Sequence, residues 1–181
     1  MKNNLITALC IVLALALACG AVCLGAYRGW SGERSQVLEA LSREGELAQS
    51  LQNRAMDAAN LAVVASRHVK EGDAASGDVA ALREGYAVLT GENADAAAIA
   101  RADAAISGAA SRLAAVLPEL PSVQASPRDQ AYISTLTRTL SEDTGAAAAF
   151  AGAVRDYNAR LTGSLTGRLA MLLGVAPLTA E

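Results

Sequence analysis

The side chains in this sequence that could act as an acid, a base or a metal ligand are few and far apart. His68 is the only histidine, and the cationic Lys70 follows two positions later. A general base or a metal-ligating imidazole needs a partner within reach, and no neighbouring motif supplies one. A positive charge near the end of a helix is also favoured by the helix dipole. We therefore predict a structural role for His68.

Two pairs of carboxylates could contribute to a cation site. Glu142 and Asp143 are adjacent in the sequence, and Asp73 and Asp78 are five positions apart. Adjacent side chains on a helix point about 100° apart, so they do not converge on one ion. A solvated helix face, or a helix N-terminus that favours negative charge, explains both pairs better. We predict no metal site and no cofactor.

Patterns that mark common active sites do not occur. The sequence contains no glycine-rich phosphate loop, no His-Glu-x-x-His pair and no Gly-x-Ser-x-Gly elbow. Lys2 is the only charged residue before Arg28, so residues 28–181 hold all but one of the 15 basic residues and all 18 acidic ones. An acidic domain lacks the clustered Lys and Arg that bind phosphate backbones. We predict neither an enzyme nor a nucleic-acid partner.

Polar side chains within otherwise apolar helical sequence mark the candidate interaction positions. Tyr157 and Asn158 form the most distinctive pair. In one interpretation, Tyr157 fills an apolar seam with its hydroxyl at the bundle edge, while Asn158 caps or bridges to a neighbouring helix. In the other interpretation the pair is a recognition surface, and we prefer the first. Arg54 and Asn60 are open to the same two interpretations, because they lie on a helix whose apolar face is mostly alanine.

A long apolar run from Leu5 to Tyr27 places the chain at a membrane. It contains no charged residue, and as a helix it is about 35 Å long, enough to cross a hydrocarbon core of about 30 Å with some tilt. Tyr27 and Trp30 flank Arg28, which is the arrangement expected where a helix leaves the bilayer. We predict a single-pass anchor over residues 1–27 and a helical domain over residues 28–181.

Two alternatives to a retained anchor remain open. A cleaved secretory signal has an apolar stretch of about 7 to 15 residues, and this run continues well past its small residues Ala16-Leu17-Ala18. Ala18-Cys19-Gly20 is similar to a lipoprotein cleavage site, although Ala16 stands where leucine is usual, and Cys19 would then carry the lipid. All three cysteines lie in this run, so the rest of the chain can form no disulfide.

The rest of the chain has the pattern of long helices. Residues 31–70 contain no proline, and their apolar residues recur at spacings of three and four. Breaks at Glu71-Gly72-Asp73 and Gly91-Glu92-Asn93 predict a short helix over residues 78–89 and a longer one over residues 94–117. Three prolines then prevent a continuous helix: Pro118, Pro121 and Pro127.

The last helix carries an apolar seam at heptad spacing. The seam comprises Ile133, Leu136, Leu140, Ala147, Phe150, Val154, Tyr157, Leu161 and Leu172. A first helix of about 40 residues, a broken return and a final helix of similar length pack most economically as an antiparallel bundle. The predicted fold is therefore all-α: an N-terminal single transmembrane helix followed by an elongated antiparallel up-down-up helical bundle of three long helices, the second broken.

Two segments resemble the LemA family of bacterial membrane-anchored proteins. Residues 51–61, LQNRAMDAANL, are similar to the family stretch LQ-R-R-Y-D-L-I-P-N-L. Residues 153–158, AVRDYN, resemble the family signature A-V-R-x-Y-N, and Pro118-Glu119-Leu120 stands where members carry a proline-containing turn. Ser164-Leu165 replaces the Phe-Pro of the family, so the chain resembles a divergent member.

The resemblance implies an N-terminal membrane helix, a long helical bundle and a role in envelope or membrane-associated interactions, without an agreed enzymatic activity. It also implies that the matching positions are candidate interaction residues. These are Arg54, Asn60, Arg155, Tyr157 and Asn158. The expected partners are membrane lipid around the N-terminal helix, unidentified membrane or envelope proteins, and a second copy of the chain in a homo-oligomer.

Two classes of function remain open. The protein is either a non-enzymatic, membrane-anchored interaction or scaffolding module, or a ligand-binding or sensor module resembling the helical periplasmic domains of chemoreceptors. A chemoreceptor-like chain needs a second span, and the later apolar stretch from Leu169 to Leu178 is too short to cross. We expect the first function, at the bacterial cytoplasmic (inner) membrane. Two signals compete over the side of the membrane. Lys2 and the amino terminus resemble the basic start of an export signal, which would leave the bundle outside. Three arginines that follow the span favour a bundle on the cytoplasmic side, which we prefer: Arg28, Arg34 and Arg43.

Overall fold

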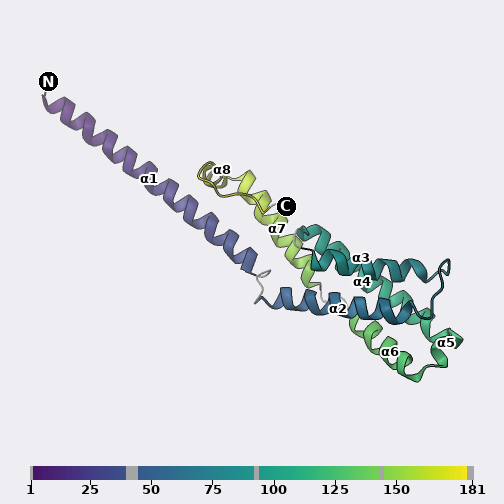
Figure 1. The fold of residues 1–181 in the computed structure, drawn as a ribbon. Helices are drawn as coiled ribbons and strands as arrows, with labels where there is room; N and C mark the ends of the chain where they lie inside the picture. The colour runs from purple at the N-terminus through teal and green to yellow at the C-terminus, as the bar shows by residue number, and fades with distance from the viewer. Residues whose placement is uncertain (1, 40–44, 92–93, 143–144, 179–181) are drawn as a thin grey trace. The chain divides into compact units, whose positions relative to one another are not determined.

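The computed structural model describes residues 2–39, 45–91, 94–142 and 145–178, and every regular element within them is helical (Figure 1). The all-α prediction is therefore confirmed. The predicted helices over residues 78–89 and 94–117 correspond to α3 and α4. In chain order the elements are α1 (Lys2–Glu39), α2 (Glu46–Ala65), α3 (Ser76–Thr90), α4 (Ala96–Val116), the short 3-10 helix η1 (Leu117–Glu119), α5 (Pro121–Gln124), α6 (Pro127–Ser141), α7 (Ala146–Gly163) and α8 (Leu165–Leu172).

The chain divides into two compact units. The first, here called the α1 unit, comprises Met1–Leu38 and Val154–Thr179. The second, here called the bundle unit, contains Glu39–Ala153. The boundary predicted between residues 27 and 28 falls inside α1, which continues without a break to Glu39.

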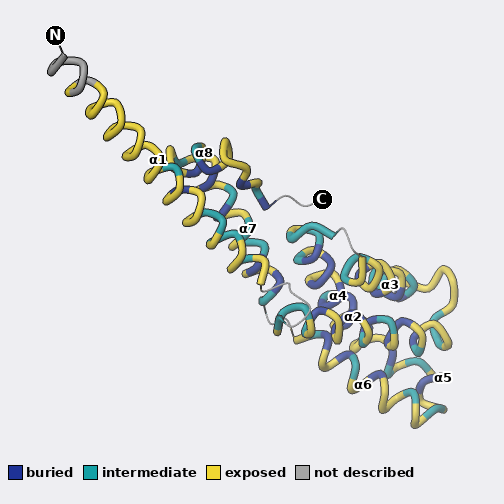
Figure 2. Tube along the Cα trace, turned by 60° about the vertical axis from the view of Figure 1, so that its left-hand side comes forward, coloured by how far each residue is buried: buried dark blue, intermediate teal, exposed yellow. Residues whose placement is uncertain are grey.

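Four helices build the bundle unit. Both α2 and α4 pack against α3 and against α6, so the four helices enclose one core (Figure 2). The apolar stripe predicted for α2 faces this core, where Leu51, Ala55, Ala58, Ala62 and Ala65 are buried. The larger fully buried side chains come mainly from the other elements: Leu82, Ile106, Leu113, Leu117, Val123, Ile133 and Leu140.

Small residues let α3 and α4 approach closely. A Cβ atom built on Gly85 of α3 would lie 2.5 Å from Cγ1 and 2.8 Å from Cδ1 of Ile106 in α4. Because real Cβ atoms do not approach carbon this closely, only glycine fits at this crossing without a shift of the neighbouring side chain. The absence of a side chain at Gly85 is therefore what permits this close approach of α3 and α4.

The helices are shorter than the sequence pattern predicts. The helix expected over residues 31–70 is interrupted, because α1 ends at Glu39 and α2 begins after Gly45, whose ψ of 139° is extended. The sequence predicted that the chain between the first and last long helices forms one broken helix. In the structure this part of the chain forms α3 and α4, which pack side by side. The predicted last helix is divided into α6, α7 and α8. The up-down-up arrangement of three long helices is therefore not confirmed, and the bundle unit has the four-helix core described above. Leu41 and Arg43 lie outside the described residues.

Local signals explain where the later helices begin and end. The backbone N–H of Asp129 donates to Ser126 Oγ at 3.5 Å, and Pro127 follows at the first helical position of α6. Gly145, with φ of +66°, precedes α7 in a conformation that favours glycine. The N–H of Gly167 donates to Ser164 Oγ at 2.9 Å, which caps the start of α8. Asp143 lies outside the described residues.

The α1 unit joins the end of α1 to the C-terminal part of the chain. Tyr157, Leu161, Ala170, Val175 and Leu178 form its buried cluster, with Trp30, Val37 and Val154 packed against them. Leu172, which the sequence assigned to the apolar seam, is 85% exposed, so that assignment is wrong. The seam fails there because α8 is a separate helix that does not continue the face of α7.

One helix among the described residues is long and apolar enough to cross a membrane. It covers Leu9–Glu39 of α1, and only 6% of its most apolar window is buried. Large apolar side chains such as Leu9, Val12 and Leu17 are exposed along it. A signal sequence at an N-terminus would satisfy the same criteria of length and composition.

Candidate functional site

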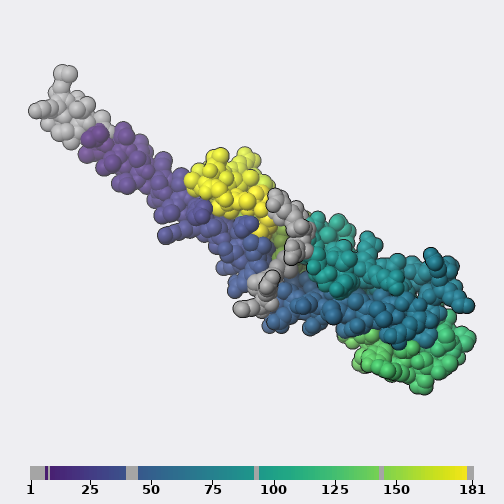
Figure 3. Space-filling view, viewed as in Figure 1, coloured from purple at the N-terminus to yellow at the C-terminus, as the bar shows by residue number. Residues whose placement is uncertain are grey.

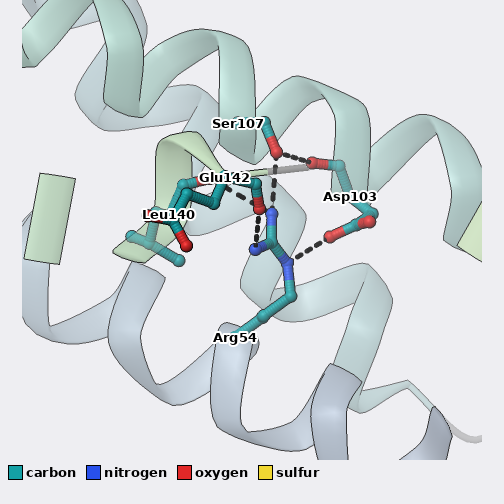
Figure 4. A network of polar contacts seen from close by, with 5 residues as sticks. All are labelled: Arg54, Asp103, Ser107, Leu140 and Glu142. Atoms are coloured by element: carbon teal, nitrogen blue, oxygen red, sulfur yellow. Dashed lines mark hydrogen bonds and ion pairs between the residues drawn. The ribbon is translucent and has the colours of Figure 1, made fainter. Parts of the chain in front are cut away.

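Arg54 is the centre of a buried polar network in the bundle unit (Figure 4). Its Nε donates to Asp103 Oδ1 at 2.5 Å, and its Nη2 donates to Ser107 Oγ at 2.7 Å. The same guanidinium donates to two backbone carbonyls at the end of α6, those of Leu140 at 3.2 Å and Glu142 at 3.0 Å. Arg54 is only 7% exposed, and Asp103 only 2%.

The network connects three helices through one side chain. Arg54 comes from α2, and Asp103 and Ser107 come from successive turns of α4. The carbonyls of Leu140 and Glu142 are among those that a helix leaves unpaired at its C-terminus, where positive charge is favoured. Arg54 therefore caps α6 and is held in place by a carboxylate of α4. This geometry makes Arg54 a structural clamp that a partner cannot reach.

An open groove lies between α2 and α6 on the surface of the bundle unit. It encloses about 750 Å³ and is lined by Asp57, Asn60, Val63, Val64, Arg67, Arg128, Asp129, Ala131, Tyr132, Thr135 and Leu136. Asn60 is exposed here, so it is the candidate position of α2 that a partner can reach. Val63 and Tyr132 are 55% and 50% exposed, which gives the groove an apolar floor that water covers in the isolated chain.

Charged groups lie along the same groove. The guanidinium of Arg128 lies 5.8 Å from the centre of the Tyr132 ring, within the range of a cation–π contact. Asp57 and Asn60 line the groove from α2. The groove thus combines exposed aromatic and aliphatic surface with polar groups, the composition expected of a surface that binds another protein segment.

His68 and Asp129 connect the segment after α2 to the first turn of α6. The His68 Nε2 and Asp129 Oδ2 atoms lie 3.1 Å apart, and Arg67 Nη1 lies 3.3 Å from Asp129 Oδ1. An ionised carboxylate only accepts hydrogen bonds, so His68 donates through Nε2. Among the described residues, the other ring nitrogen of His68 is buried and has no hydrogen-bond partner. A substrate cannot reach it, and the contact links two segments.

The environment of Asp129 changes its acidity. Partial burial raises the pKa of this carboxyl, but the hydrogen bonds from His68 and Ser126 and the positive charges of Arg67 and His68 outweigh that effect. The pKa of Asp129 therefore lies below its ordinary value of 3.8. The carboxylate also sits in the first turn of α6, where the helix dipole favours negative charge.

Tyr157 and Asn158 hold the α1 unit together. The Tyr157 ring packs edge-on against Trp30 of α1 with centroids 5.8 Å apart, and its hydroxyl donates to the Trp30 carbonyl at 3.5 Å. Burial raises the pKa of the Tyr157 phenol above 10.0. Asn158 binds the backbone of Leu178 twice, donating to its carbonyl at 2.9 Å and accepting from its N–H at 2.8 Å. Both side chains are engaged within the unit, whereas Arg155 is exposed.

The carboxylates singled out in the sequence do not converge. Asp78 pairs with Arg112 at 2.7 Å, and Asp73 accepts from the backbone N–H of Lys70 at 2.8 Å. The backbone carbonyl of Glu142 accepts a hydrogen bond from Arg54. Within the described ranges, no group of three or more His, Cys, Asp or Glu side chains could hold a metal ion.

The sequence pattern missed the partners of the site residues. Asp103 shares the buried face of α4 with Ile99, Ala102 and Ile106, and a single acid on an apolar helix face was a signal that a buried partner was needed. Asp129 carried a different signal, since it follows Ser126-Pro127 in the first turn of a helix.

Comparisons of the chain with protein-family models, with curated proteins and with solved structures find no match.

Proposed function

We propose that the protein is a membrane-anchored, non-enzymatic interaction or scaffolding module and a divergent member of the LemA family. The observation that carries the proposal is α1, whose apolar side chains are exposed along a helix long enough to cross a bilayer. Exposing so many large apolar side chains to water is costly, and lipid removes that cost. The proposed location is the bacterial inner membrane, with the bundle unit on the cytoplasmic side.

The groove between α2 and α6 is the proposed surface for a protein partner. Its exposed Val63 and Tyr132 give apolar contact area, and Asn60, Asp57 and Arg128 can fix the register of a bound segment. The buried cation of α2, Arg54, is already paired with Asp103. A partner can therefore use the groove without disturbing the core.

Extraction with alkaline carbonate tests the anchor in the full-length chain. We expect the protein to stay in the membrane pellet and its mass to include residues 1–27. A variant with Leu13→Arg and Leu17→Arg should be released, because two charges near the centre of the span oppose insertion. Release of the wild-type chain, or a mass that lacks the N-terminal run, would show that α1 is a removed signal and would contradict the proposal.

Site-specific crosslinking tests the groove. A photoreactive side chain at Asn60 should form adducts with other membrane or envelope proteins in native membranes. The same adducts should weaken when Tyr132→Ala removes an apolar contact from the groove. A photoreactive side chain at Arg83, exposed on α3, is the matched control and should not form them. Equal adducts at Asn60 and Arg83 would show that the groove is not the interaction surface.

A further inference from the structure

The short helix α8 presents its large apolar side chains outward and its small ones inward. Leu165 and Leu172 are both 85% exposed, and the half-buried Leu169 lies between them at helical spacing. On the inward side of the same helix, Gly167 and Ala170 are buried. A helix on the surface of a water-soluble domain has the opposite arrangement, with its leucines facing the core.

Contacts on the inner side of α8 hold the helix in the orientation in which its leucines face outward. A Cβ atom on Gly167 would lie 2.1 Å from the carbonyl oxygen of Leu161, so no larger residue fits against α7 at this point. Ser164 caps the start of α8 through the N–H of Gly167. After α8 the chain turns at Gly174, with φ of +97°, and Asn158 holds its end at Leu178. Rotation of α8 cannot bury the leucines.

The place of α8 along α1 indicates what covers this face. Trp30 Nε1 donates to Thr166 Oγ1 at 3.4 Å, so the start of α8 lies beside α1 one turn after the apolar run ends at Tyr27. Figures 1 and 2 both show α8 beside α1, and Figure 3 shows the C-terminal residues as a yellow surface next to it. Leu24 and Tyr27 of α1 are also exposed, 52% and 43%. The α1 unit therefore exposes large apolar side chains on both α1 and α8.

We propose that α8 lies in the headgroup–acyl boundary of the membrane that α1 crosses, with Leu165, Leu169 and Leu172 inserted among the lipid chains. The inference rests on the proposed membrane anchor. Tyr27 and Trp30 mark the level of the bilayer interface on α1, where amphipathic rings are favoured. Arg168 is exposed on the flank of the leucine face, where a cation can meet lipid phosphate. The α1 unit is then attached to the membrane at two places.

Spin labels on the full-length chain test this placement. Cys10, Cys19 and Cys23 are first changed to alanine, and the protein is reconstituted in vesicles of phosphatidylcholine and phosphatidylglycerol. A nitroxide is attached in separate variants at Leu172→Cys, in α8, and at Leu17→Cys, in the span. A third variant, Asp156→Cys, places it at an exposed charged position of α7 in the same unit and serves as the water reference. Collision with oxygen, which concentrates in lipid, is compared with collision with a water-soluble nickel chelate.

Each outcome decides the proposal. We expect oxygen to dominate at Leu172 and Leu17, and the nickel chelate to dominate at Asp156. If the label at Leu17 is in lipid but the label at Leu172 meets mainly nickel, α8 is in water and the inference fails while the anchor stands. If the label at Leu172 is shielded from both reagents, a protein covers α8, and the inference is also overturned. If the label at Leu17 itself meets nickel, the membrane anchor fails and the inference fails with it.

Discussion

Arg54 contributes to stability mainly because its removal would leave the buried carboxylate of Asp103 without a partner. Its guanidinium donates to the carboxylate of Asp103, the hydroxyl of Ser107 and the carbonyl of Leu140, which are buried contacts, and to the carbonyl of Glu142, which is partly exposed. A buried ion pair is weak evidence of net stabilisation, because both charges had to be desolvated. Removing only one partner is different, since the other charge then stays buried without compensation.

We expect Arg54→Met to lower the free energy of unfolding by about 3 to 5 kcal/mol, the range for breaking a buried pair. The double variant Arg54→Met with Asp103→Leu should lose less than the single one, because it removes the orphaned carboxylate. Arg67→Met is the matched control: that side chain is 58% exposed, and loss of its pair with Asp129 should cost below about 1 kcal/mol. Urea unfolding followed by circular dichroism measures all three. Similar losses for Arg54→Met and Arg67→Met would contradict the clamp.

The contact between His68 and Asp129 predicts a specific sensitivity to acid. Because the pKa of Asp129 is lowered by folding, the folded state binds fewer protons than the unfolded state near that pH. The stabilisation is therefore present above the unfolded pKa of 3.8 and is lost as the pH falls through the lowered folded value. The urea midpoint of the wild type should fall more steeply below about pH 4 than that of Asp129→Asn. Asp156→Asn, at an exposed position, should give a curve parallel to the wild type; parallel curves for all three would contradict this role.

Individual residues of the site were only partly predictable. Arg54 stood out in the sequence because a long cation interrupts an alanine-rich helix face. Its main partner did not, because Asp103 is 49 positions away and the choice depends on how α2 and α4 pack. The carbonyls of Leu140 and Glu142 carry no side-chain signal at all. Pairing across helices is a property of packing, and local sequence does not encode it.

The crossing of α3 and α4 reverses the usual effect of replacing glycine within a helix. Gly→Ala normally stabilises a helix by about 0.5 to 1 kcal/mol. At Gly85 the added methyl group would overlap Ile106, so Gly85→Ala should destabilise the bundle by about 1 to 3 kcal/mol. Gly77→Ala in the same helix meets no atom within 4 Å and should be neutral or stabilising. The urea midpoints of the two variants should therefore move in opposite directions, and a shared increase would show that the helices are not in close contact.

Helix boundaries were predictable where proline or a capping side chain marks them. The sequence predicts a break in the helix at Pro127, and α6 starts there, after the capping residue Ser126. The breaks at Gly45 and between α6 and α7 were missed, because the apolar periodicity continues across them and a lone glycine is tolerated within a helix. The seam pattern did not mark Ser164 as a boundary, yet Ser164 caps a new helix. Periodicity predicts which face is buried better than it predicts where a helix ends.

The two units depend on different kinds of long-range contact. The core of the bundle unit lies within residues 58–140, whereas the α1 unit joins residues separated by more than a hundred positions, such as Glu33 and Arg160. Sequence periodicity predicted that helices would pack, but it could not predict that the C-terminal segment returns to the first helix. That return follows from complementary surfaces, because Trp30 packs against Tyr157 and donates a hydrogen bond to Thr166.

The charges that flank the apolar run predict which side of the membrane holds the bundle unit. Basic residues near a span are retained in the cytoplasm. Arg28, Arg34 and Arg43 follow the apolar run, and only Lys2 and the amino terminus precede it. We therefore expect a single cysteine at Ser122, with the native cysteines changed to alanine, to be unreactive toward a membrane-impermeant thiol reagent in cells whose outer membrane is permeabilised. It should react once the inner membrane is broken.

Ser122 suits this experiment because it is exposed in α5. The matched variant reverses the charge balance, with Asn3→Lys and Asn4→Lys before the span and Arg28→Gln and Arg34→Gln after it. If flanking charge sets the orientation, this variant should expose the cysteine to the reagent in intact cells. Labelling of the original chain in intact cells would place the bundle unit on the outer face, and unchanged labelling of the reversed variant would show that these arginines do not determine the topology.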